Sequence, residues 1–215
     1  MKKIIIVSGG NIDKCFIKQN IKQLEHDYLI AVDKGLEILD QLDILPTHIV
    51  GDFDSIDKNI LNKYQNLTNI HQFDAKKDVT DTNIAINLAL SLKADEIIIF
   101  GATGSRIDHM LANIQNMKLA LDRQIPCKMI DTHNEIFLIN KDTKVTLNDC
   151  QSNHYLYISI LPLTIVTGLT LSGFKYQLNN YTLAIGESIG ISNELLKEGL
   201  IKLKSGILIV IKSRD

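Results

Sequence analysis

The chain lacks several features that would assign it to a special class of protein. Its 215 residues include no tryptophan, three prolines and three cysteines, and the cysteines show no CxxC spacing. An odd number of cysteines without metal-ligand spacing argues against a disulfide framework and against a structural zinc site. We therefore expect Cys15, Cys127 and Cys150 to be ordinary thiols, buried or incidental.

Long apolar segments and strong net charge are also missing. The apolar runs, such as residues 4–7 and 97–100, are far shorter than the roughly 20 residues that a membrane-spanning helix needs. The formal net charge of −2 provides no electrostatic reason to expect a nucleic-acid partner. The four aliphatic residues before residues 8–10 are too few for a secretory signal, so we expect a cytoplasmic protein.

The first half of the chain alternates short apolar runs with helix-like stretches, within a composition that is 45% hydrophobic and 22% charged. Continuous isoleucine and valine runs that end in glycine or aspartate indicate strands buried on both faces, hence a parallel sheet. Residues 82–92 have the spacing of an amphipathic helix, with Thr80 or Asp81 available as its N-cap. Residues 1–125 are therefore predicted to form a doubly wound α/β domain. The predicted strands include 3–7, 29–32, 48–50 and 96–100.

The second half is rich in short β-like segments and shows no helical period of useful length. This pattern predicts a small antiparallel β-sandwich over residues 126–215. Asn179 and Asn180 are candidates for a hairpin turn between two of its strands. The expected strands are 128–130, 136–139, 144–147, 155–161 and 207–211.

Carboxylates follow several of the predicted parallel strands. Because ligands bind outside the carboxyl ends of such strands, Asp33, Asp52 and Asp54 are expected to meet at one rim. Carboxylates gathered in this way repel one another unless a cation lies between them, and Mg²⁺ prefers oxygen ligands. The alternative is that each aspartate caps the following helix. We favour the metal, because Asp52 and Asp54 are two apart in an extended segment and would crowd each other.

Two further clusters fit a phosphorylated ligand. In residues 77–81, Asp81 is either a simple N-cap or part of the metal shell, and Lys77 would meet a phosphate. Residues 101–109 open a helix with glycines that let backbone N–H groups approach an anion, although neither a P-loop nor a GxGxxG pattern is present. Arg106 either neutralises phosphate charge or pairs with Asp108, and His109 alone is more typical of a packed or capping residue. These residues predict a Mg²⁺-dependent enzyme acting on a nucleotide or a similar anion.

Six segments, in this order, resemble the thiamine pyrophosphokinase family over nearly the whole chain. They are VDKG at 32–35, GDFDS at 51–55, KDVTD at 77–81, GATGSRIDH at 101–109, GFKYQL at 173–178 and ISNE at 191–194. The family often has a second glycine where Ser105 stands. Its animal members stack a tryptophan near thiamine, and this chain has none.

The resemblance implies a reaction and a role for each motif. The thiamine hydroxyl would attack the β-phosphorus of ATP, giving thiamine diphosphate and AMP, in a homodimer whose active sites are shared between subunits. Asp33, Asp52, Asp54 and Asp81 would surround Mg²⁺ and the phosphates, and Asp52, Asp54 and Asp81 would be catalytic. The nucleotide would be held by Asp33, Lys77, Asp78, Gly101, Gly104, Arg106, Asp108 and His109. Ser192 and Asn193 would bind the pyrimidine end of thiamine.

Three alternatives remain open from the sequence. A related pyrophosphokinase would use another hydroxymethyl heterocycle, such as a pterin, as its acceptor. A nucleotide hydrolase would use water instead of the alcohol. A non-catalytic module would only bind nucleotide or thiamine, although retention of every candidate metal carboxylate disfavours it. The general base is left open between Asp81 and Asp52.

Overall fold

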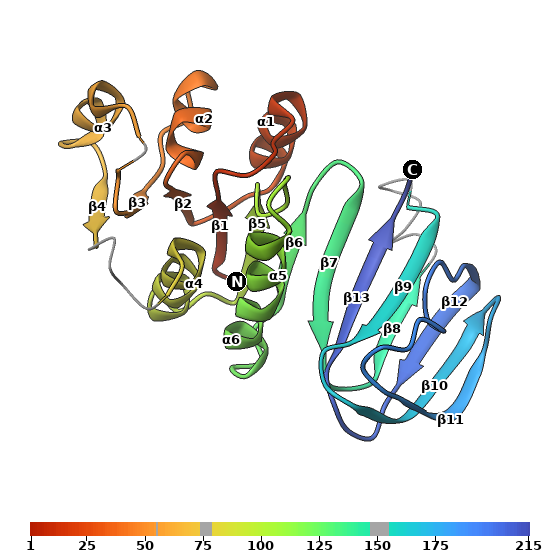
Figure 1. Ribbon diagram of the computed structural model, residues 1–215. Coiled ribbons are helices and arrows are strands. Elements are labelled where there is room, and N and C mark those ends of the chain that lie inside the picture. Colours follow the sequence, from red (N-terminus) through yellow and green to blue (C-terminus); the bar gives the residue numbers. More distant parts are fainter. Residues whose placement is uncertain (55, 74–78, 147–154) are drawn as a thin grey trace. The chain divides into compact units, whose positions relative to one another are not determined.

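The computed structural model describes residues 1–54, 56–73, 79–146 and 155–215. The chain divides into two compact units, Met1–Thr132 and His133–Asp215, and each is described by itself (Figure 1). The first unit extends seven residues beyond the expected end of the α/β domain at residue 125. It does so because β6 (Cys127–Ile130) pairs in parallel with β5 (Glu96–Phe100).

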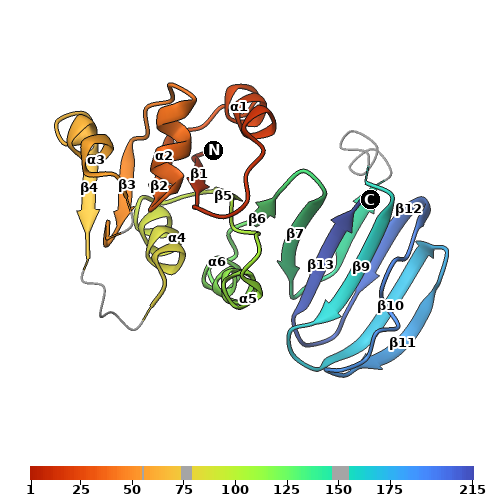
Figure 2. The same cartoon turned by 45° about the horizontal axis from the view of Figure 1, so that its top comes forward.

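The first unit is built on a parallel sheet with the strand order β4-β3-β2-β1-β5-β6. Figures 1 and 2 show α1, α2 and α3 on one face and α4, α5 and α6 on the other. The remaining strands are β1 (Lys3–Val7), β2 (Tyr28–Val32), β3 (His48–Gly51) and β4 (Asn69–Gln72). The helices are α1 (Lys14–Gln23), α2 (Gly35–Gln41), α3 (Lys58–Tyr64), α4 (Asp81–Ser91), α5 (Ile107–Asn116) and α6 (Lys118–Leu121).

Apolar side chains cover both faces of this sheet. Ile5 and Val7 of β1 pack in one buried cluster with residues of α1, α2 and α3, whereas Ile4 and Ile6 point to the opposite face and are equally buried. On that opposite face α4 packs against β1, β2 and β3 and buries Ala85 and other small or aliphatic residues. Most buried side chains of β1, β2, β3 and β5 are therefore apolar, with His48 of β3 as an exception, and a ligand site is expected at the ends of the sheet.

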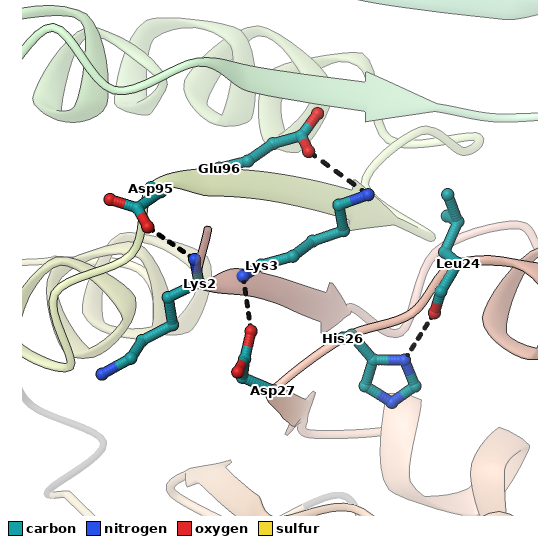
Figure 3. Close-up of polar contacts among 7 residues, drawn as sticks. All are labelled: Lys2, Lys3, Leu24, His26, Asp27, Asp95 and Glu96. Atoms are coloured by element: carbon teal, nitrogen blue, oxygen red, sulfur yellow. Dashed lines mark hydrogen bonds and ion pairs between the residues drawn. The ribbon is translucent and has the colours of Figure 1, made fainter.

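The amino ends of the strands are fastened by carboxylates, as Figure 3 shows. Asp95 accepts a hydrogen bond from the backbone N–H of Lys2 at 2.5 Å, and Asp27 accepts one from the N–H of Lys3 at 2.8 Å. The ammonium of Lys3 also lies 3.4 Å from the carboxylate of Glu96. These acidic residues therefore have a structural role, since they bind backbone N–H groups and a lysine at the amino edge of the sheet. A ligand site is expected at the opposite, carboxyl edge.

The second unit contains two antiparallel sheets. One has the strand order β7-β13-β9 and the other β11-β10-β12-β8. Residues of both, such as Ile160, Val210, Leu169 and Ile201, form one buried cluster, so the sheets pack as a sandwich. The strands are β7 (Asn134–Ile139), β8 (Thr143–Thr146), β9 (Tyr157–Pro162), β10 (Val166–Phe174), β11 (Leu178–Leu183), β12 (Leu195–Lys202) and β13 (Leu208–Ser213). The predicted fold class, a doubly wound α/β domain followed by an antiparallel β-sandwich, is confirmed.

The predicted hairpin turn at Asn179 and Asn180 is wrong. Both residues lie inside β11, and the turn that joins β10 to β11 is formed by residues 175–177. Asn180 has a left-handed backbone with φ 49°, its N–H donates to Thr170 Oγ1, and the strand register shifts nearby. Asparagine tolerates left-handed backbone in bulges as well as in turns, so the sequence pattern could not separate the two.

The thiols fit the expectation for residues without a special role. Cys15 is exposed on α1, and Cys127 is buried in β6. Burial raises the pKa of the Cys127 thiol to about 12, which keeps it protonated and unreactive at neutral pH. Cys150 lies outside the described residues. Among the residues that the structure describes, no helix is both long enough and apolar enough to span a bilayer.

The second unit holds a buried ion pair whose loss is measurable. Lys212 donates to Glu135 at 2.8 Å, and the two side chains are only 8% and 6% exposed. Glu135→Ala leaves a buried ammonium without its counter-ion and is expected to lower the free energy of unfolding by about 3–5 kcal/mol in urea titrations. Asp122→Ala is the control, because the Lys118–Asp122 pair is exposed and contributes under about 1 kcal/mol. Equal effects of the two substitutions would contradict this ranking.

Candidate active site

Two loops meet at the carboxyl edge of the sheet, between neighbouring strands β1 and β5. The N–H of Ser8 donates to the carbonyl of Phe100, that of Gly10 to Gly101, and that of Asn11 to Thr103, all at 2.8–2.9 Å. The loop after β1 is therefore fixed to the glycine-rich segment 101–104 by backbone alone. Both loops lie at strand ends, which is where the sequence predicts a ligand site.

Glycine is required where these loops touch. A Cβ on Gly10 would clash with the carbonyl oxygens of Thr103 and Gly101. Gly101 has φ 66°, and a Cβ there would clash with the carbonyl of Ser8. The sequence suggested that the glycines of segment 101–104 admit an anion to the backbone. Their geometry adds a second reason, since the two loops could not approach each other with side chains in between.

Asp33 lies beside the segment that follows β3. Its backbone is left-handed with φ 46°, and its N–H donates to the carbonyl of Val50 at 3.1 Å. Its Oδ1 lies against the Cα of Gly51, where a Cβ would clash with it. Asp52 is the residue after Gly51, and its Oδ1 accepts a hydrogen bond from the N–H of Asp54 at 3.1 Å. The structure thus brings the three predicted rim carboxylates into one short region.

These carboxylates do not form a preassembled metal cage. Within the described ranges, no group of three or more histidine, cysteine, aspartate or glutamate residues is arranged to hold a metal ion. The donor set is still suited to Mg²⁺, because it consists of carboxylate oxygens from Asp33, Asp52 and Asp54. Mg²⁺ is usually held by one or two carboxylates together with substrate phosphates and water rather than by an all-protein cage.

Asp81 reaches the same edge from the start of α4. The N-cap is Thr80, whose Oγ1 accepts a hydrogen bond from the N–H of Asn83 at 3.3 Å, so Asp81 is the first residue of the helix. Next to it, the hydroxyls of Thr82 and Ser8 lie 3.3 Å apart, which joins the helix to the end of β1. Lys77 and Asp78, predicted to complete this cluster, lie outside the described residues, as does Ser55.

The charged residues that open α5 are exposed and paired with each other. The guanidinium of Arg106 donates to the carboxylate of Asp108 at 2.5 and 3.2 Å. This hydrogen bond is the main reason why the pKa of Asp108 is lowered to about 2. The ion pair that the sequence offered as an alternative is therefore formed, and His109 is exposed beside it.

The two predicted thiamine-binding residues, which lie in the second unit, behave differently. Ser192 is exposed, with a left-handed backbone at φ 53° and its N–H donating to Ser159 Oγ at 2.9 Å. Asn193 is only 3% exposed. Its Oδ1 accepts from the N–H groups of Tyr176 and Glu194, and its Nδ2 donates to the carbonyl of Tyr176 at 2.7 Å. Three of the four hydrogen bonds available to this amide therefore hold the protein's own backbone.

Comparison with known proteins assigns the family. Residues 21–129 match the thiamin pyrophosphokinase catalytic domain, and residues 142–208 match the thiamin pyrophosphokinase vitamin B1 binding domain. The chain belongs to the thiamin pyrophosphokinase family. The resemblance proposed from six short motifs is confirmed.

Several relatives of the thiamin pyrophosphokinase family match the chain over most of its length. A curated thiamine pyrophosphokinase of Bacillus subtilis (strain 168) is 37% identical, with 100% of both chains covered. A Caenorhabditis elegans thiamin pyrophosphokinase 1 is 28% identical over 85% of this chain and 77% of its own. The crystal structure of a Bacillus subtilis thiamine pyrophosphokinase superposes with a TM-score of 0.87 at 35% identity, covering 100% of both chains. One from Geobacillus thermodenitrificans gives 0.84 at 30%, covering 99% and 98%.

Sequence reasoning missed two asparagines on α5. Asn113 donates to the carbonyl of Ala102, and Asn116 contacts Thr80 and Asn83. Their signal was available, since amide side chains three residues apart on a packed helix face need a polar partner. Nothing in the sequence said which segments would supply that partner.

Gly101 provides a test of the loop junction. Gly101→Ala is expected to cost about 1–3 kcal/mol of stability more than Gly186→Ala, measured by urea unfolding. Both positions have positive φ and share the backbone strain, but a Cβ meets a backbone carbonyl at Gly101 and open space at Gly186. If the two variants unfold at the same urea concentration, the loops are not held together as tightly as described.

Proposed function

We propose that the chain transfers the diphosphate of ATP to the hydroxyl of thiamine, giving thiamine diphosphate and AMP. The observation that carries this conclusion is the match to both the catalytic and the vitamin B1 binding domains, together with full-length relatives that are thiamine pyrophosphokinases. The thiamine oxygen forms a bond to the β-phosphorus, the bond from that phosphorus to the oxygen bridging to the α-phosphate breaks, and AMP leaves with the α-phosphate.

We propose that Mg²⁺ is bound by Asp33, Asp52, Asp54 and Asp81 together with the phosphates. The support is the position of the first three carboxylates around Gly51 and of Asp81 at the start of α4. When bound, the metal would neutralise charge on the phosphate oxygens as the bond to AMP breaks. Removal of the hydroxyl proton of thiamine falls to a carboxylate of this group, with Asp81 and Asp52 as the two candidates.

We assign the nucleotide to the loops after β2 and β5. Gly101 and Gly104 lie in the segment fixed by the loop after β1, and Asp33, Lys77 and Asp78 would complete the surroundings of ATP. Arg106, Asp108 and His109 stand exposed at the start of α5, where the Arg106–Asp108 pair would have to open for the guanidinium to bind phosphate. Such an exposed pair contributes little to stability, so it opens at small cost.

We assign thiamine to Ser192 and Asn193, with a homodimer whose active sites are shared between subunits. Asn193 would act chiefly through the backbone of Tyr176, which it clamps, and Ser192 through its exposed position. Exposed apolar side chains near these residues in the sequence support contact with a second copy of the chain. They are Tyr176, Ile185, Ile189, Ile191 and Leu196. The cytoplasmic location stays a prediction.

The reaction is tested by product analysis. The protein is incubated with ATP, Mg²⁺ and either thiamine or a hydroxymethylpterin, and mass spectrometry follows AMP and the diphosphorylated alcohol. We expect thiamine diphosphate and AMP in equal amounts with thiamine alone. Asp52→Asn should lower turnover by about 100- to 1000-fold, because it removes charge that acts in the transition state. Its thermal midpoint without Mg²⁺ should hold or rise, since repulsion within the rim falls.

Other products would favour the other activities. Diphosphorylated pterin would indicate the related pyrophosphokinase, and ATP breakdown without a diphosphorylated alcohol would indicate a hydrolase. Binding of ATP and thiamine without AMP would indicate a sensing module. If Asp52→Asn loses activity only because it unfolds, Asp52 is a structural cap.

The acceptor assignment is tested with Asn193→Ala and Ser192→Ala. Asn193→Ala leaves the backbone polar groups of Tyr176 unsatisfied, at a cost of about 1–3 kcal/mol. If that segment forms the thiamine pocket and has to be ordered on binding at the same cost, thiamine affinity in calorimetry should fall by roughly 5- to 150-fold, the equivalent of that energy. ATP affinity should stay within about twofold. Ser192→Ala should weaken thiamine binding without lowering stability, since its side chain is exposed. Parent-like thiamine binding by both variants would move the pocket elsewhere.

A further inference from the structure

Helix α5 holds two separate parts of the candidate active site through its asparagines. Asn113 is buried, and its Nδ2 donates to the carbonyl oxygen of Ala102 at 2.9 Å, inside segment 101–104. Asn116 Nδ2 donates to Thr80 Oγ1 at 3.1 Å, and Asn116 Oδ1 accepts from Asn83 Nδ2 at 2.9 Å. One helix therefore contacts both the loop after β5 and the N-terminus of α4.

The spacing of the two asparagines makes this a single clamp. Residues three apart in a helix lie on the same face, and α4 and α5 pack against each other. Thr80 is the N-cap of α4 and Asp81 is the next residue, so the bond from Asn116 fixes the backbone on which Asp81 stands. Ala102 lies between Gly101 and Gly104, so the bond from Asn113 fixes the proposed nucleotide loop.

Helix stability alone does not explain these residues. Asparagine is a poorer helix former than alanine, because its side chain competes for backbone hydrogen bonds. In the contacts described above, neither side chain bonds within its own helix. Both bond to residues of other segments. The sheet ladder also ends before the segments they hold, since the pairing of β1 with β5 stops at Val7 and Phe100. The clamp supplies a constraint that the sheet does not.

We propose that Asn113 and Asn116 are positioning residues for phosphoryl transfer. Asn113 sets the loop that receives ATP, and Asn116 sets Asp81 relative to that loop. This inference rests on the proposed function. It adds to that function an explanation of how segment 101–104 and the start of α4, over twenty residues apart in sequence, keep a fixed position relative to each other. Phosphoryl transfer depends mainly on positioning, and a misplacement of about 1 Å costs on the order of 100-fold in rate.

The proposal predicts a different kinetic effect for each asparagine. Asn113→Ala should raise the KM for ATP by about 5- to 10-fold with a smaller change in kcat. Asn116→Ala should lower kcat by about 10- to 100-fold and leave the KM for ATP and for thiamine within about twofold. All values are taken per folded protein, with the folded fraction measured by circular dichroism at the assay temperature.

Asn20→Ala is the matched control. Asn20 is also a helical asparagine whose Nδ2 donates to a carbonyl oxygen, that of Phe16 at 2.9 Å, but this bond stays within α1. It should change neither kinetic constant. A gain in helix propensity and the loss of side-chain hydrogen bonding are common to all three variants, so only the link to the active site separates them.

A double-mutant cycle tests the shared bond directly. Asn83→Ala and Asn116→Ala each remove the Asn83–Asn116 hydrogen bond, so the double variant should lose about as much kcat as the worse single variant. If Asn116→Ala does not fold, the same contact is probed from Thr80. Thr80→Val keeps the shape but removes the acceptor and should lower kcat, and Thr80→Ser should recover most of that loss.

The outcomes separate the positioning role from the reaction itself. If neither the parent nor Asn20→Ala forms thiamine diphosphate and AMP, the proposed function fails. If both are active and the α5 variants match them in kcat and KM, the positioning role is overturned. If the α5 variants lose only folded fraction while kcat and KM per folded molecule are unchanged, the asparagines are structural and the proposal is equally overturned.

Discussion

The arrangement of the active site depends on one constraint, the burial of a parallel sheet on both faces. Ile4, Ile5, Ile6 and Val7 are fully buried, and the same is nearly true along β2 and β5. Strands of this kind cannot carry catalytic groups along their length, so polar residues gather where the strands end. The two edges of the sheet at which the strands end have different roles. At the amino edge, carboxylates hold backbone N–H groups. At the carboxyl edge, other carboxylates lie beside the loops that we assign to Mg²⁺ and ATP.

Close backbone contact builds the carboxyl edge. Gly10 and Gly101 allow two loops to bond directly, and Gly51 leaves the space in which the carboxylate of Asp33 lies. A methyl group at any of these positions would meet a backbone or carboxylate oxygen. The fold therefore requires these glycines, whether or not a ligand does. A glycine in such a motif is not by itself evidence that the backbone contacts a phosphate.

In the second unit, the side chain of Asn193, which was expected to contact thiamine, makes its hydrogen bonds to the protein's own backbone. Asn193 is buried and holds the backbone of Tyr176 on both its N–H and its carbonyl, while its own backbone pairs with Ile158. Asn113 and Asn116 act in the same way in the first unit. Short amides suit this role, because they donate and accept from a side chain with few rotamers.

The sequence by itself determined the fold class, the strand-end positions of the aspartates and glycines, and the family, because hydrophobic period and motif order are local properties of the chain. It also left the N-cap open between Thr80 and Asp81 and placed a turn at Asn179 and Asn180. Only the tertiary structure decided these, along with the pairing of Arg106 with Asp108 and the inward orientation of Asn193. The Thr80 cap and the Arg106–Asp108 pair join residues three and two apart, and the sequence offered both without deciding between them and their alternatives. Asn193 and Asn180 instead bond segments 17 and 10 residues away, and such partners are chosen by packing, which no local pattern encodes.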